Sequence, residues 1–242
     1  ARNCLMPMGI TSENVVEKYG MTREELDEFA ADSQRKACAA NKDGRLPSEI
    51  TPVKTIILDK DGNETEVVVD RDDGMREGTT AEKLSKLKPA FRKGGWTTAG
   101  NSSQVTDGAG AVLLARRSVA ERLGLPIHGR VVSYAVAGVP PDVMGIGPAF
   151  AIPAALKKAG LTVDDIDIYE INEAFASQCL YSAKHLNIDL KKLNPRGGAI
   201  ALGHPLGATG ARQIKTLFSE LERTGKRFGC VSMCIGTGMG AA

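Results

Sequence analysis

Residues 194–210 read Asn194-Pro195-Arg196-Gly197-Gly198-Ala199-Ile200-Ala201-Leu202-Gly203-His204-Pro205-Leu206-Gly207-Ala208-Thr209-Gly210. Five glycines fall within the fourteen residues that begin at Gly197, a density that suits neither a plain strand nor a plain helix. Glycine favours backbone with positive φ or backbone that approaches a ligand closely. From Gly207 onward the apolar residues recur at helical spacing, so His204 lies just before a predicted helix, where free N–H groups collect. The segment therefore indicates either a structural glycine loop with a hydrogen-bonded histidine or a catalytic loop.

The composition excludes several classes of protein. A net charge of +2 and an aromatic content of 5% favour neither nucleic acid nor a membrane surface as a partner. The cysteines number five, an odd count without a CxxC pair, which argues against a disulfide framework and a zinc site and fits a reducing compartment. The most apolar stretch, 135–156, is interrupted by four prolines, so we expect no membrane span. The chain opens without a secretory signal.

Predicted strands alternate with predicted helices over much of the chain, which indicates a layered α/β fold. A capping box at Thr22 to Glu25 opens a helix that ends before Asp43. A hairpin is expected at 53–59 and 64–70. Further helices are predicted at 11–20, 118–123, 147–159, 173–185 and after the glycine loop, and further strands at 107–115, 130–135, 166–171 and 228–234.

Three polar segments, 171–175, 203–205 and 234–236, follow predicted strands or open predicted helices. In open α/β folds, reactive groups collect at strand ends. Each segment also has an ordinary interpretation, because a lone asparagine is often an N-cap and a buried cysteine is often inert. Together they supply an amide, an imidazole and a thiol, which suit chemistry that places negative charge on a thioester oxygen while a proton moves. The other cysteines are interpreted as inert: Cys4, Cys38, Cys179 and Cys230.

Basic residues gather before these segments, as a solvated face or as a patch for a phosphorylated small molecule. They are Arg76, Lys83, Lys86, Lys88, Arg92 and Lys93.

Long motifs along the whole chain resemble the signature loops of the thiolase family, in the family's order. They are Asn172-Glu173-Ala174-Phe175, residues 197–207 and residues 234–240, supported by residues 8–15, 98–103 and 144–148. Within the family, the sequences of these segments are more similar to those of the degradative 3-ketoacyl-CoA thiolases of peroxisomes than to those of the acetoacetyl-CoA enzymes. The resemblance implies an α/β thiolase fold, layered α/β/α, with a five-stranded mixed sheet in the C-terminal domain and an added loop domain.

The resemblance also implies a division of the chain. Residues 1–102 are expected to form a partial loop domain on the CoA-binding side, residues 103–124 the closing segment of the N-terminal domain, and residues 125–242 a C-terminal domain without its last strand. The motif of the nucleophilic cysteine does not occur in these 242 residues. We therefore expect this chain alone to be inactive, and its apolar segment 108–115 to promote aggregation.

Catalytic roles follow from the resemblance. Cys234 matches the cysteine that protonates the departing acetyl-CoA enolate and later deprotonates CoA. His204 matches the histidine that activates the nucleophile and binds the thioester oxygen. Asn172 matches the asparagine that holds a water in the same oxyanion hole, and Gly236 matches a backbone donor of the second hole.

Substrate contacts follow in the same way. Ser103 matches a pantetheine contact, and Met8, Met144 and Phe175 match residues that line the pantetheine and acyl end. Arg76 and Lys83 fall where the family contacts the nucleotide of CoA. Coenzyme A is expected as a substrate, without a covalently bound cofactor or a metal.

The expected function is that of an acyltransferase, a 3-ketoacyl-CoA thiolase. It cleaves 3-oxoacyl-CoA with CoA into acetyl-CoA and a shortened acyl-CoA in fatty acid β-oxidation, as a homodimer in the peroxisome. The alternative is a catalytically incomplete module that binds CoA or pairs with a full subunit. A ketosynthase is disfavoured, because it uses a second histidine where this chain has Cys234.

Overall fold

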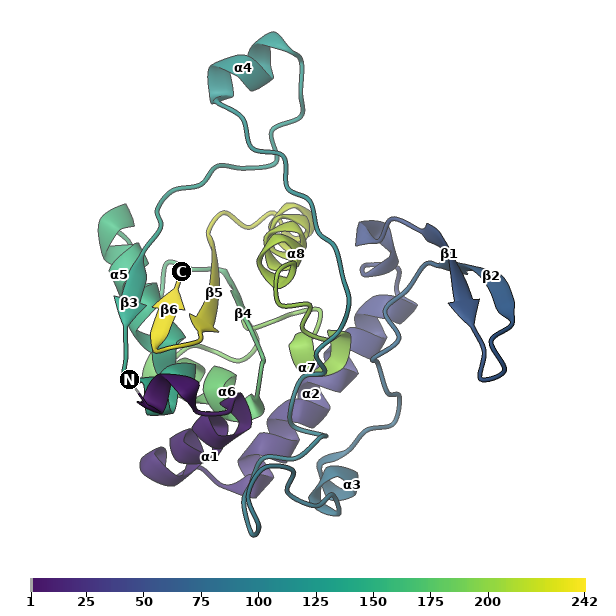
Figure 1. Ribbon diagram of the computed structural model, residues 1–242. Helices are drawn as coiled ribbons and strands as arrows, with labels where there is room; N and C mark the ends of the chain where they lie inside the picture. The colour runs from purple at the N-terminus through teal and green to yellow at the C-terminus, as the bar shows by residue number, and fades with distance from the viewer. Residues whose placement is uncertain (1) are drawn as a thin grey trace.

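A mixed four-stranded sheet forms the centre of residues 2–242, which are the residues that this computed structural model describes (Figure 1). The strand order is β3-β6-β5-β4. The edge strand β4 pairs with β5 in parallel, and β6 is antiparallel to both of its neighbours. The strands are β3 (Val136–Gly138), β4 (Ile168–Ile171), β5 (Gly229–Ile235) and β6 (Met239–Ala241).

Helices cover both faces of this sheet. On one face, Tyr169 and Ile171 of β4 pack with apolar residues of α5 (Gly147–Ala159) and α6 (Ala176–His185). On the other face, Ile168 packs with Leu217 and Leu221 of α8 (Thr209–Thr224). This alternation along β4 is the pattern expected of a strand buried on both faces. The α/β/α layering predicted from the sequence is therefore confirmed.

The N-terminal part adds two helices that pack beside α6 and a hairpin that projects from the body (Figure 1). As predicted, α2 (Arg23–Lys42) begins with a capping box between Thr22 and Glu25. The predicted hairpin is also confirmed, as antiparallel β1 (Val53–Leu58) and β2 (Glu64–Val69). The other helices are α1 (Met8–Tyr19), α3 (Ala81–Ser85), α4 (Arg117–Arg122) and α7 (Ala199–Leu202), with 3-10 helices η1 (Arg2–Leu5), η2 (Pro47–Glu49) and η3 (Pro141–Ile146). Across residues 2–242, no helix combines the length and apolar character that a membrane crossing requires.

Two predicted strands are wrong. Residues 107–115 form an exposed, extended coil, in which Leu113 and Leu114 are 82% and 73% exposed. Residues 130–135 are also coil, and regular pairing begins only at Val136. Both segments have strand-like composition, but within residues 2–242 no neighbouring strand pairs with residues 107–115, and in the second segment only Ala135 exchanges backbone hydrogen bonds, with Ala242. The described sheet consequently has four strands and not the five expected.

The predicted helix at 173–185 starts later, at Ala176, because residues 172–175 form a turn. The glycine-rich segment also contains a short helix, α7, that its composition did not indicate.

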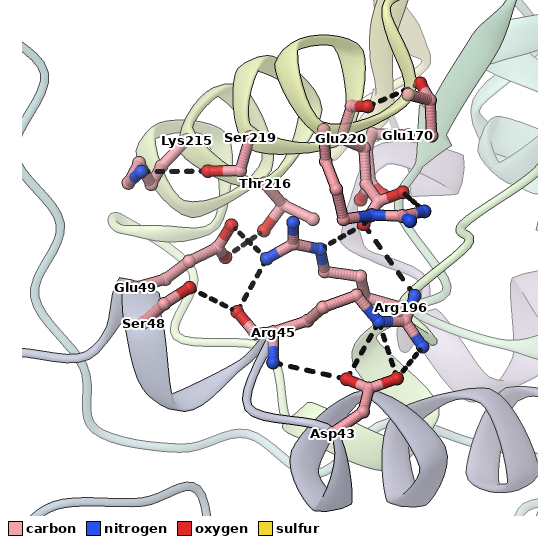
Figure 2. A network of polar contacts seen from close by, with 12 residues as sticks. Asp43, Arg45, Ser48, Glu49, Glu170, Arg196, Lys215, Thr216, Ser219 and Glu220 are labelled. Atoms are coloured by element: carbon pink, nitrogen blue, oxygen red, sulfur yellow. Dashed lines mark hydrogen bonds and ion pairs between the residues drawn. The ribbon is translucent and has the colours of Figure 1, made fainter.

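A buried ion network ties the start of the glycine-rich segment to α8 and to residues 45–49 (Figure 2). Arg196 contacts Glu220 through Nε and Glu49 through Nη1, each at 2.7 Å. The same Nη1 donates to the carbonyl oxygen of Arg45 at 2.6 Å. The three charged side chains are 8% exposed or less. Buried charges of this kind are tolerated because each has its partners.

Replacing Arg196 by Met should destabilise the protein by about 3–5 kcal/mol, because two buried carboxylates lose a charged partner and Glu49 keeps only the hydroxyl of Thr216. Urea unfolding measures this loss. The matched control is Arg117→Met, which breaks an exposed pair with Glu121 and should cost about 1 kcal/mol or less. Equal losses in the two variants would contradict the prediction.

The uncovered apolar segments should bind an apolar fluorescent dye. Introducing Leu113→Lys together with Val131→Lys should reduce dye fluorescence without lowering the unfolding midpoint, since these side chains are 82% and 72% exposed. Leu26→Ala serves as the contrast, because Leu26 is 1% exposed. That variant should lose about 2–5 kcal/mol of stability. Unchanged dye binding in the double variant would show that these segments are covered in solution.

Candidate active site

The turn after β4 begins at the same sheet edge toward which β5 runs. The backbone N–H of Asn172 donates to the carbonyl oxygen of Ser232 at 2.9 Å. Because β4 and β5 are parallel, their carboxyl ends meet at this edge, and Cys234 lies two residues beyond Ser232. Two of the predicted segments are therefore brought together by strand pairing.

The third segment reaches this edge through α7. Gly203 follows that helix with φ of 89°, and a Cβ at this position would lie 2.6 Å from Thr106. The backbone N–H of His204 donates to the carbonyl oxygen of Gln104 at 2.8 Å. The chain thus enters the histidine in a backbone conformation that favours glycine, and residues 104–106 support it.

The imidazole of His204 has a polar partner at each nitrogen. Nδ1 lies 2.7 Å from the hydroxyl of Thr209, and Nε2 lies 3.3 Å from Nδ2 of Asn172. The Thr209 hydroxyl also donates to the carbonyl oxygen of Pro205 at 3.2 Å. Because a hydroxyl can donate or accept, the Thr209 contact fits either tautomer of the neutral ring, and the tautomer with its proton on Nε2 can donate to a ligand oxygen.

Electrostatics keep this imidazole neutral. Burial, and secondly the charge of Arg212, lower the pKa of His204. Beside it, the side-chain oxygen of Asn172 is buried without a hydrogen-bond partner among the described residues. An unpaired buried acceptor next to a neutral imidazole is suited to orient a water molecule or a polar group of a ligand.

The thiol of Cys234 faces the helix layer of α6, on the side of the sheet opposite to α8. Its Sγ donates to Oε1 of Gln178 on α6 at 3.4 Å. Nε2 of Gln178 in turn lies 3.7 Å from the sulfur of Met144. Burial raises the pKa of Cys234 to about 12, so the group is a protonated thiol at neutral pH. The structure thus joins Asn172 and His204 directly, whereas the hydrogen bond of Cys234 goes to Gln178.

Gly236 lies in the turn between β5 and β6. A Cβ at this position would meet no atom within 4 Å, so packing does not require glycine here. Two residues later, Gly238 does need its conformation, because φ is 106° and a Cβ would overlap the carbonyl oxygen of Val139. The open side of Gly236 is compatible with the approach of a ligand.

Of the four predicted pantetheine and acyl contacts, Ser103 bonds the turn at residues 172–175 and Phe175 belongs to it, whereas Met144 and Met8 lie on η3 and α1. The backbone N–H and the hydroxyl of Ser103 both donate to the carbonyl oxygen of Ala174 at 3.0 Å. Phe175 packs edge-to-face on Phe91, with ring centroids 5.8 Å apart. Met144 is buried near Gln178. Met8 is 38% exposed and precedes Gly9, where a Cβ would overlap the Phe91 ring.

Arg76 and Lys83 lie on a separate, exposed segment. The backbone N–H of Arg76 donates to Gln34 at 2.8 Å, and Nζ of Lys83 donates to the carbonyl oxygen of Gly78 at 2.6 Å. Arg76 also lines a cavity of about 580 Å³ along α2. Neither residue makes a hydrogen bond to Asn172, His204 or Cys234 within residues 2–242. In the same part of the chain, no group of three or more His, Cys, Asp or Glu is arranged to hold a metal.

Sequence reasoning missed three residues of this site: Thr209, Gln178 and Glu173. Thr209 lies one turn after His204 and carried a weak signal, since a hydroxyl at a helix start commonly bonds nearby groups. Gln178 is 56 residues from its partner Cys234, and no local pattern reveals that contact. Glu173 is buried, although its charge suggests exposure.

The raised pKa of Cys234 predicts the pH dependence of its alkylation. The thiolate is the reactive form, so between pH 7 and 10 the rate should rise about tenfold per pH unit without levelling off. Mass spectrometry after iodoacetamide treatment follows residue 234, in a Cys4→Ala, Cys38→Ala background. A plateau near pH 9, the ordinary pKa of a cysteine, would contradict the prediction.

Comparison with known proteins agrees with this arrangement. The family model "Thiolase, N-terminal domain" matches residues 3–118, and "Thiolase, C-terminal domain" matches residues 125–242. The chain is 66% identical to 3-ketoacyl-CoA thiolase B, peroxisomal, of Rattus norvegicus, and the match covers 100% of this chain and 57% of the rat protein. The chain thus spans somewhat more than half the length of this curated relative.

Solved structures share the fold. The crystal structure of the dimeric peroxisomal thiolase of Saccharomyces cerevisiae matches with a TM-score of 0.91 at 55% identity, over 99% of this chain and 59% of that one. The human mitochondrial 3-ketoacyl-CoA thiolase in complex with CoA also gives a TM-score of 0.91, at 43% identity, over 98% of this chain and 57% of that one. Sequence motifs, family models and fold agree along the chain, which therefore belongs to the thiolase family.

Proposed function

We propose that this chain is the part of a 3-ketoacyl-CoA thiolase that carries its acid–base groups. One observation carries the proposal: the neutral imidazole of His204 lies 3.3 Å from the amide of Asn172, whose oxygen is buried and unpaired among residues 2–242. The pair lies at the sheet edge toward which the strand of Cys234 runs. A water held by the Asn172 oxygen, together with the His204 ring when its proton is on Nε2, can donate to a thioester oxygen as it becomes negative.

The reaction is thiolytic cleavage of 3-oxoacyl-CoA by CoA. Cys234 enters as a protonated thiol, which can donate its proton to the carbon of the departing acetyl-CoA enolate. The resulting thiolate then takes the proton of the incoming CoA thiol and returns the site to its starting state. His204 and a water held by Asn172 stabilise the oxyanion of the cleaved thioester, and the backbone N–H of Gly236 serves the oxyanion hole of the acyl-enzyme. The acyl group is held on a nucleophilic cysteine whose motif these 242 residues do not contain, so the proposal concerns the complete protein.

Binding of CoA follows the same edge of the sheet. The human relative named above is described as a complex with CoA, and this supports CoA as a substrate here. Ser103, Met8, Met144 and Phe175 are proposed to line the pantetheine and acyl end, and the contact of Ser103 with Ala174 supports this. Arg76 and Lys83 are proposed for the nucleotide phosphates, because both are exposed cations on one segment.

Assembly and location are proposed from the relatives. The yeast structure is described as a dimeric peroxisomal thiolase, which supports a peroxisomal homodimer acting in fatty acid β-oxidation. The division into 1–102, 103–124 and 125–242 is proposed from the same resemblance, and the start of the C-terminal family model at residue 125 supports its last boundary.

A catalytically incomplete module that binds CoA or pairs with a full subunit remains the second candidate. It is favoured by the exposed apolar residues at 112–114, which offer a surface for a full subunit.

Substituting His204→Ala or Cys234→Ala in the complete protein should lower kcat for thiolysis by about 10²–10⁴-fold, because each removes a proton-transfer or oxyanion group. Loss of 3-oxoacyl-CoA, followed by chromatography, measures the rate. The matched controls are His128→Ala, an exposed histidine, and Cys230→Ala, which lies on the same face of β5 as Cys234. Activity near wild type for either test variant would refute the assignment, and activity of the unextended chain without a nucleophilic cysteine would refute the mechanism.

A further inference from the structure

Glu173 is an acidic residue whose side chain is buried away from solvent. Its residue is 1% exposed, and its carboxylate accepts three hydrogen bonds. Ser33 Oγ donates to Oε2 at 2.6 Å, and the backbone N–H of Ile200 donates to the same oxygen at 3.3 Å. Nδ2 of Asn194 donates to Oε1 at 2.7 Å. Burial raises the pKa of Glu173, and these donors oppose that shift by stabilising the charged form.

All these donors belong to the segment that ends in His204, or are bound to it. Asn194 and Ile200 lie in that segment, ten and four residues before the histidine. Ser33 on α2 donates to Glu173 and accepts from the backbone N–H of Gly198 at 3.1 Å. A Cβ at residue 198 would overlap the carboxyl group of Glu173, so glycine is required for this approach. One carboxylate therefore gathers residues 194, 198 and 200.

Glu173 directly follows Asn172 in sequence, so its hydrogen bonds also hold the backbone of Asn172, the partner of His204. The Asn194 side chain also bonds the backbone N–H and the carbonyl oxygen of Ile171, each at 2.9 Å. Asn194 cannot flip its amide without placing its NH₂ group against the N–H of Ile171. The Asn194 side chain thus joins the turn at 171–173 to the segment at 194–200, and only one orientation of its amide satisfies all of these hydrogen bonds.

We propose that Glu173 is a positioning residue that sets the spacing between the Asn172 amide and the His204 imidazole. The inference rests on the proposed function. The two side chains are 32 residues apart in sequence and 3.3 Å apart in space, and the carboxylate bridges the segments that carry them. Because effective catalysis depends on placing reacting groups to within about 1 Å, a shift of one segment against the other should slow the reaction.

The chain offers a matched control in Glu13. This carboxylate is 0% exposed and accepts from the backbone N–H groups of Trp96 and Thr97. It also lies against a glycine, Gly95, where a Cβ would overlap it. Glu13 therefore resembles Glu173 in burial and packing, but the loop it holds carries none of the proposed catalytic side chains.

The experiment compares Glu173→Gln with Glu13→Gln in the complete protein. A Gln amide keeps the size of the side chain but places an NH₂ group against a donor, either Asn194 or Ile200. We expect kcat to fall by about 10–100-fold in Glu173→Gln, with KM for CoA changed by less than about threefold. Glu13→Gln should lower the unfolding midpoint to a similar extent and keep kcat within about twofold per folded molecule. Ser33→Ala, a milder change that should leave the protein folded, should lower kcat by about 3–10-fold.

A second readout is independent of activity. The imidazole ¹⁵N signals of His204, identified by their loss in His204→Asn, should shift or broaden in Glu173→Gln and stay unchanged in Glu13→Gln. If His204→Ala retains activity, the proposed function fails, and these signals still test the positioning role. If Glu173→Gln and Ser33→Ala leave both kcat per folded molecule and the His204 signals at their wild-type values, Glu173 is structural and the inference is overturned.

Discussion

The parallel pairing of β4 with β5 is the constraint on which the candidate site depends. It aligns the ends of two strands, so Asn172 leaves the sheet beside Ser232 and the chain reaches Cys234 on the neighbouring strand. Side chains alternate along each strand, and this directs the thiol toward α6 and the amide toward the layer of α8. The segment after α7 brings the imidazole of His204 to the same edge of the sheet. Each further contact of the site refines a position that strand register has already determined.

Buried polar groups make that refinement. Glu173 holds the glycine-rich segment against the turn at residue 172, and Arg196 ties the beginning of the same segment to Glu49 and Glu220. A buried charge is stabilising only where all its partners are in place, so each of these clusters admits few alternative arrangements. Rigid placement of this kind suits a site whose amide and imidazole act on the same atom. The glycines serve the same purpose, because Gly198 and Gly203 allow backbone to pass where a side chain would not fit.

Local patterns predicted much of the fold and the residue types of the site. The capping box at Thr22 and the hairpin at residues 53–70 depend on neighbouring residues, and both are confirmed. The strand at 107–115 was wrong because composition reports a preference for extended backbone but not whether a partner strand is present. The partners of Glu173 and Cys234 were missed for a related reason: their contacts join residues 140 and 56 positions apart. The sequence indicated which types of side chain form the site, but it did not indicate the long-range hydrogen bonds that hold them in place.

The long separation between Ser33 and Glu173 has a consequence for biosynthesis. Ser33 leaves the ribosome 140 residues before the carboxylate to which it donates. At a translation rate of about 5–20 residues per second, roughly 7–28 s pass between the synthesis of Ser33 and that of Glu173. During that interval Ser33 has no carboxylate to donate to, and the apolar residues on the same face of α2 are uncovered. Completion of this hydrogen-bond cluster is thus a late event in translation, and a nascent chain that stalls before residue 173 leaves that face of α2 unpaired.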